Sequence, residues 1–87
     1  MAKRIGADKP RNARTLDEAL GAALTQMRVK KGWSQLQFAE LVGFDEGYMR
    51  QIERGIKSPT LRTLKHISDA LSISTSALIR AAERRLP

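Results

Sequence analysis

The sequence of 87 residues contains no cysteine, so it can form neither a disulfide nor a cysteine-based metal site. This absence fits a reducing compartment, and we expect a cytoplasmic protein. Its hydrophobic stretches all fall short of the roughly 20 residues that a membrane-spanning helix needs. We therefore expect no contact with a membrane, and the length allows one domain at most.

Aromatic residues are scarce, with two Phe, one Trp and one Tyr. Proteins that bind single-stranded nucleic acid commonly stack its bases on exposed aromatic rings, so this composition favours a duplex partner. The sequence has a single histidine, His66, and it lacks the further ligands that a metal site needs. The sequence also lacks a recognisable nucleophile–base set and a glycine-rich phosphate loop, so we predict neither an enzyme nor a cofactor.

Positive charge is what the sequence has in excess, with 16 Lys and Arg against 9 Asp and Glu and a formal net charge of +7. Residues 1–14 alone hold five basic side chains and one acidic side chain. A basic segment attached to a mildly basic domain is typical of proteins that bind a polyanion. We predict that residues 1–14 are a disordered basic arm, which serves either polyanion binding or solubility.

Residues 15–87 are predicted to form one all-α domain of five helices. Each predicted helix follows a capping residue and carries hydrophobic residues at helical spacing. The predicted caps are Thr15, Ser34, Asp45, Thr60 and Ser74. The spacing on the fourth helix predicts a buried face made of Leu61, Leu64, Ile67, Ser68 and Leu71. We find no strand pattern between these segments.

Residues 34–60 carry the most informative pattern. Two short helical segments meet at Gly43 and Phe44, and the second segment carries charged and polar residues on its outward side. This is the layout of a helix-turn-helix, in which one helix supports a second helix that enters the major groove of DNA. Together with the positive charge, this layout predicts a protein that binds double-stranded DNA.

The residues that support this prediction extend over most of the predicted domain. They are Arg28, Gly32, Ser34, Gln35, Phe38, Ala39, Gly43, Ile52–Gly55, Pro59–Leu61, Leu64, Ala70, Leu71 and Leu78. With these residues, the sequence from about Leu20 to Ile79 resembles the Cro and phage-repressor type of helix-turn-helix domain, the xenobiotic-response-element family of bacterial regulators. In size and layout it is also similar to the controller proteins of restriction-modification systems. The resemblance implies a repressor-like DNA-binding domain that regulates transcription.

The resemblance places base-reading side chains at Glu46 and Gly47, and Arg50 and Gln51 lie on the same outward side. A Glu can accept from cytosine N4, an Arg can bind guanine with two hydrogen bonds, and a Gln can bind adenine. Gly47 can read no base edge but permits close approach. Arg50 stands where the family commonly has a small hydroxyl residue, so we predict either a longer base reader or a phosphate contact.

A second set of residues is predicted to contact the DNA backbone. The resemblance implies that Gln35 contacts a phosphate and braces the recognition helix, which is the second helix of the helix-turn-helix. The loop after that helix and the start of the fourth helix offer cations and free amide groups to phosphate, at Arg54, Lys57, Ser58 and Thr60. The resemblance also implies a buried structural ion pair between Arg28 and Glu53.

One recognition helix contacts few base pairs, so we expect a homodimer on a pseudo-palindromic operator. On the fifth helix, Leu78 matches an inward position, and the predicted dimer interface is a separate stripe that includes Ile79, Ala82 and Leu86. Alternatively, Ile79 folds back onto the first helix and Leu86 frays. Two rival functions stay open: an antitoxin-type module that neutralises a partner protein and binds DNA secondarily, and a polyanion binder without sequence choice.

Overall fold

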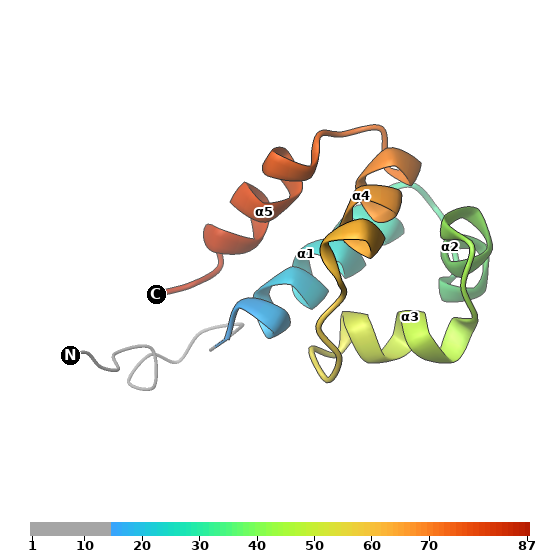
Figure 1. Ribbon diagram of the computed structural model, residues 1–87, viewed down its shortest axis with the longest axis horizontal. Helices are drawn as coiled ribbons and strands as arrows, with labels where there is room; N and C mark the ends of the chain where they lie inside the picture. Colours follow the sequence, from blue (N-terminus) through green and yellow to red (C-terminus); the bar gives the residue numbers. More distant parts are fainter. Residues whose placement is uncertain (1–14) are drawn as a thin grey trace.

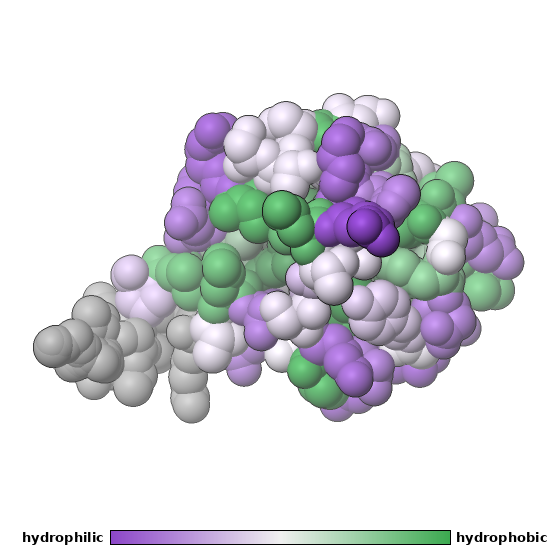
Figure 2. Space-filling model, viewed as in Figure 1, coloured by the Kyte–Doolittle hydropathy of each residue, from purple (hydrophilic) through white to green (hydrophobic). Residues whose placement is uncertain are grey.

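The computed structural model describes residues 15–87, which form five helices and no strand (Figure 1). The helices are α1 (Leu16–Lys30), α2 (Gln35–Val42), α3 (Glu46–Glu53), α4 (Leu61–Ala70) and α5 (Thr75–Glu83). The face shown in Figure 2 is largely hydrophilic, but hydrophobic side chains gather on it between α4 and α5. The all-α prediction is thus confirmed, whereas the predicted basic arm, residues 1–14, lies outside the described residues.

The helices begin where local capping chemistry predicts. Four of the five predicted N-caps accept a hydrogen bond from the backbone of their own helix, namely Thr15, Ser34, Thr60 and Ser74. Asp45 occupies the N-cap position of α3, but its side chain makes no capping hydrogen bond. Its carboxylate lies beside Gly47 instead. Asp45 therefore holds the predicted cap position without capping the helix through its side chain.

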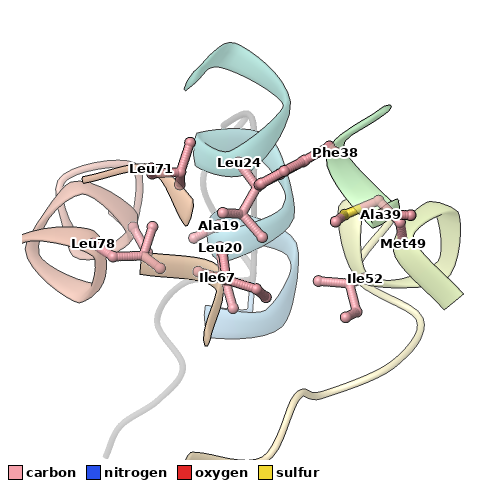
Figure 3. Close-up of a cluster of buried hydrophobic side chains, with 11 residues drawn as sticks. Ala19, Leu20, Leu24, Phe38, Ala39, Met49, Ile52, Ile67, Leu71 and Leu78 are labelled. Atoms are coloured by element: carbon pink, nitrogen blue, oxygen red, sulfur yellow. The ribbon is translucent and has the colours of Figure 1, made fainter. Parts of the chain in front are cut away.

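A hydrophobic core joins the five helices, and α1 lies at its centre (Figure 3). Leu20 and Leu24 of α1 lie between two groups of side chains. Leu71 and Leu78 lie on one side, and on the other side lie Phe38, Ala39, Met49 and Ile52. Consequently α5 and α3 lie on opposite sides of α1 (Figure 1).

Two hydrophobic residues do not lie where their spacing predicts. Leu61, assigned to the buried face of α4, is 77% exposed, because it is the first residue of the helix and Leu64 and Ile67 already supply the contact with the core. Ala82, predicted in the dimer stripe, is fully buried within the core. It follows Leu78 by four residues and therefore lies on the same face of α5.

The rest of the predicted stripe is only partly available to another molecule. Leu86 is half-buried and packs against the core, so it does not fray from the domain. Ile79 is also half-buried, one turn after the half-buried Thr75. The exposed part of the stripe is therefore limited to Thr75 and Ile79.

Gly21 in α1 was not singled out by the sequence pattern, yet it determines how closely α3 approaches. It is buried against the last carbonyl groups of α3. A Cβ atom at this position would lie 2.3 Å from the Glu53 carbonyl oxygen and 2.6 Å from that of Ile52. The available signal was a glycine inside a helical pattern, which costs about 1 kcal/mol relative to Ala and usually has a packing reason.

Candidate nucleic-acid interface

The turn between α2 and α3 sets the angle at which the two helices meet. Gly43 ends α2 with φ of 101°, a left-handed conformation that favours glycine. The N–H groups of Gly43 and Phe44 both donate to the carbonyl oxygen of Ala39, at 2.8 and 3.0 Å. The Ala39 side chain is fully buried, and its small size lets the two helices pack closely. The predicted helix-turn-helix is therefore present.

The outward face of α3 carries a shallow hollow of about 480 Å³. It is lined by Asp45, Gly47, Tyr48, Arg50, Gln51, Arg54 and Ile56. Three predicted base readers, Gly47, Arg50 and Gln51, are thus brought together with the predicted backbone contact Arg54. Glu46 is not part of this lining, although it lies on the same helix.

Two lining residues of this hollow were not predicted to face outward. Tyr48 is half-buried, and its ring packs edge-on against Phe44, with centroids 4.8 Å apart. Ile56 is exposed in the loop after α3. Neither has a clear sequence signal, because Tyr48 lies at the border of the hydrophobic stripe of α3 and Ile56 lies in a loop, where no helical spacing applies.

Glu46 and Arg50 are close to each other in the structure. A guanidinium nitrogen of Arg50 lies 3.8 Å from a carboxylate oxygen of Glu46, one helical turn away, and both side chains are nearly half exposed. An exposed pair of this kind contributes at most about 1 kcal/mol. A phosphate or a base edge can therefore compete for Arg50 at little cost.

The predicted ion pair between Arg28 and Glu53 lies directly behind the recognition helix. The Arg28 guanidinium donates to both carboxylate oxygens of Glu53, at 2.8 and 3.1 Å, and the Glu53 side chain is only 3% exposed. Arg28 also donates to the carbonyl oxygen of Trp33 at 2.9 Å. The hydroxyl of Thr25 lies 3.0 Å from Glu53 and 2.9 Å from the Gly21 carbonyl oxygen. This network ties α3 to α1 and to the loop before α2.

Gln35 completes this network from the first turn of α2. Its amide nitrogen donates to Glu53 at 2.9 Å. Gln35 therefore braces the recognition helix, as the resemblance implies. Its contact with a DNA phosphate stays a prediction.

The loop after α3 continues the same edge of the molecule (Figure 1). The N–H groups of Ile56 and Lys57 donate to the carbonyl oxygen of Gln51, which fixes the loop to the end of α3. Arg54, Lys57 and Ser58 are exposed there. The Thr60 hydroxyl is engaged with Thr63 as the cap of α4. The side chains of Arg54, Lys57 and Ser58 are therefore free to contact a DNA backbone as predicted. The Thr60 hydroxyl is already used as the cap of α4.

His66 and most of the carboxylates lie within residues 15–87, the part of the chain that the structure describes. His66 is exposed, and this part of the chain holds no group of three or more His, Cys, Asp or Glu placed to bind a metal ion. None of its helices is long and apolar enough to cross a membrane.

A model of the helix-turn-helix family matches residues 24–78. The transcriptional regulator SutR of Escherichia coli is 35% identical over 68 residues, a match that covers 78% of this chain and 38% of SutR. This chain thus spans well under half the length of SutR.

Solved structures show the same similarity. The clp gene regulator ClgR of C. glutamicum has a TM-score of 0.79 and 33% identity, covering 84% of this chain and 94% of that one. The restriction-modification controller protein C.AhdI of Aeromonas hydrophila has a TM-score of 0.68 and 33% identity, covering 70% and 92%. The biofilm regulator SinR, crystallised with DNA, has a TM-score of 0.65 and 31% identity, covering 69% and 97%.

Proposed function

Because the chain belongs to the helix-turn-helix family, we propose that it is a sequence-specific transcriptional regulator that binds double-stranded DNA as a homodimer. The observation that carries this proposal is the outward face of α3, where Gly47, Arg50 and Gln51 line one hollow. The helix that presents them is braced from behind by the network around Glu53. The SinR structure, which contains DNA, supports the same role for this chain.

Affinity and sequence choice are divided between two groups of residues. Arg54 and Lys57 are exposed cations at the end of α3 and in the following loop. Cations that neutralise phosphates release counterions and strengthen binding to any duplex. The side chains in the hollow of α3 face base edges and supply the choice of sequence. Selection of bound duplexes from a random pool should therefore return a pseudo-palindrome, and recovery of unrelated sequences would contradict the proposal.

Arg50→Ala should weaken binding to the selected site by about 1–3 kcal/mol and relax the preference at one base position, because a base-edge contact is lost. Lys57→Ala should weaken binding to all duplexes and reduce the salt dependence of the affinity, because one phosphate contact is lost. Titration of specific and random duplexes at several salt concentrations distinguishes the two effects. If Arg50→Ala weakened both duplexes equally, Arg50 would be a phosphate contact.

The second copy in the proposed dimer packs where α4 meets α5. A groove of about 620 Å³ is lined there by Leu61, Arg62, Lys65 and Thr75, and Leu61 is the most exposed large hydrophobic residue of the described chain. Figure 2 shows hydrophobic side chains gathered between these two helices. Ile79 follows Thr75 by one turn and extends the same surface. A two-fold axis here would bury Leu61 and present two recognition helices to successive turns of DNA, about 34 Å apart.

Leu61→Glu should convert the dimer into a folded monomer and weaken binding to a full palindrome by about 100-fold or more, because the two half-sites are no longer linked. Sedimentation and duplex titration measure the two effects. Ile79→Glu, at the half-buried end of the same surface, should act in the same direction. The control is Leu41→Glu, which places the same charge at an exposed leucine of α2. Equal behaviour of Leu61→Glu and Leu41→Glu would exclude this interface.

A further inference from the structure

Two adjoining hollows follow the side of α1 that faces α5. The first, of about 440 Å³, is lined by Met27, Lys30, Lys31, Leu71, Ser72 and Ile73. The second, of about 310 Å³, is lined by Ala23, Gln26, Met27, Lys30, Ala81, Arg84 and Arg85. Because both contain Met27 and Lys30, they form one continuous surface, which we call the basic groove.

The charge of the basic groove has one sign. Its lining holds four cationic residues, Lys30, Lys31, Arg84 and Arg85, and no carboxylate. The salt bridges found within residues 15–87 involve none of these four side chains. Arg85 donates to the neutral amide of Gln26. The Lys31 ammonium lies 5.5 Å from the centroid of the Trp33 ring, and an exposed contact of this kind contributes only about 0.5–1 kcal/mol. The cations are thus available to carboxylates of another molecule.

The floor of the groove is hydrophobic at one end. Met27 and Ile73 are half-buried and pack against the core, and Leu71 is almost fully buried beneath them. An apolar side chain can therefore enter between two lysines. A DNA backbone has no group that uses such a floor, whereas an amphipathic helix places apolar and charged side chains side by side.

The basic groove is separate from both surfaces of the proposed function. The recognition helix α3 lies on the other side of α1 from α5 (Figures 1 and 3). On α5 the groove residue Ala81 follows Ile79 by two positions, a rotation of about 200° around the helix axis. The groove and the proposed dimer surface therefore lie on different flanks of α5, and the groove stays open in a dimer bound to DNA.

We propose that the basic groove docks an acidic amphipathic helix of a partner protein. Apolar side chains of that helix enter the hollow formed by Met27, Leu71 and Ile73. Its carboxylates lie against the cations of the groove, which are contributed by the end of α1 and by the residues that directly follow α5. Such docking would let a DNA-bound copy of this protein recruit a second protein without disturbing either the DNA or the dimer.

The proposal can be tested with a probe peptide, a fluorescent synthetic helix of about 14 residues, ~21 Å long, with leucines on one face and glutamates on the other. The control peptide has the same composition in scrambled order. Binding to the full chain is followed by anisotropy, and the contact surface is mapped from amide chemical shifts. We expect shifts at Met27, Lys30, residues 71–73 and residues 81–85, and weaker binding of the scrambled peptide.

Arg84→Glu and Arg80→Glu form a matched pair of variants, since both residues are exposed arginines one turn apart at the end of α5. Only Arg84 lines the basic groove. Arg84→Glu should lower the affinity of the protein for the probe peptide about tenfold, because an attraction is replaced by a repulsion. Arg80→Glu should change this affinity by less than about twofold, since a well-exposed charge outside the groove is screened by salt. Lys30→Glu, on α1, should behave like Arg84→Glu.

Several results would overturn the proposal. The proposal is wrong if the two arginine variants lower the affinity for the probe peptide equally, or if the scrambled peptide binds as tightly as the probe. It is also wrong if the chemical-shift changes caused by the probe fall on α3. A saturating DNA duplex should leave the probe bound, and displacement by the duplex would also contradict it. If duplex DNA itself shifts the groove amides and Arg84→Glu weakens DNA binding more than Arg80→Glu does, the groove contacts nucleic acid. Because the probe assay needs no DNA, its outcome is independent of the proposed function.

Discussion

Arg28→Met should lower the free energy of unfolding by about 3–5 kcal/mol, because it leaves the Glu53 carboxylate buried without its cation. Thr25 and Gln35 would still donate to that carboxylate, but neither carries a compensating charge. Urea unfolding followed by circular dichroism measures the loss. Since Glu53 is the last residue of α3, the same substitution should also loosen the recognition helix and weaken DNA binding.

Arg50→Met provides the control for this prediction. Arg50 lies 3.8 Å from Glu46, and both side chains are nearly half exposed, so its removal should cost less than about 1 kcal/mol of stability. The double variant Arg28→Met with Glu53→Leu should cost less than Arg28→Met alone, because no unpaired charge remains buried. Equal costs for Arg28→Met and Arg50→Met would show that burial of the Glu53 carboxylate is not what makes the pair important.

Gly21→Ala should destabilise the protein by about 1–3 kcal/mol, which is the usual cost of overpacking a well-packed core. The expected sign is unusual, because replacing glycine by alanine inside a helix ordinarily stabilises it by about 1 kcal/mol. Here the new methyl group would lie 2.3 Å from the backbone oxygen of Glu53, and a helix backbone cannot move aside locally. The whole of α3 would have to shift away from α1, so DNA binding should fall as well. Thermal unfolding and duplex titration measure the two losses.

Gly47→Ala is the matched variant on α3. A Cβ atom there would meet only a carboxylate oxygen of Asp45, at 3.1 Å, and that side chain can move. This variant should therefore stabilise the free protein by up to about 1 kcal/mol, while DNA affinity falls because the methyl group occupies the surface that approaches the bases. If Gly21→Ala stabilised the protein as Gly47→Ala does, the contact between α1 and α3 would be looser than the structure implies.

Local features of the fold were predictable from the sequence. The helices begin at Thr15, Ser34, Thr60 and Ser74 because a side-chain hydroxyl and a backbone amide only three residues away interact within one turn. The turn at Gly43 is equally local, since its positive φ favours glycine. The resemblance also implied the pairing of Arg28 with Glu53, although spacing alone could not bring together residues 25 positions apart.

Tertiary packing alone decided which flanks of the helices are buried and which are exposed. Spacing assigns Leu61 to the inside of α4 and Ala82 to the outside of α5, and the structure reverses both. The reason is that a helical stripe is wider than one contact, so the angle and depth at which α4 and α5 pack on α1 determine which edge is buried. The same packing places Gly21 against α3 and assembles the basic groove from distant residues. The sequence by itself thus determined the helices, four of their five side-chain caps and the polar outward face of α3, while only the tertiary structure decided which remaining surfaces are free to bind a partner.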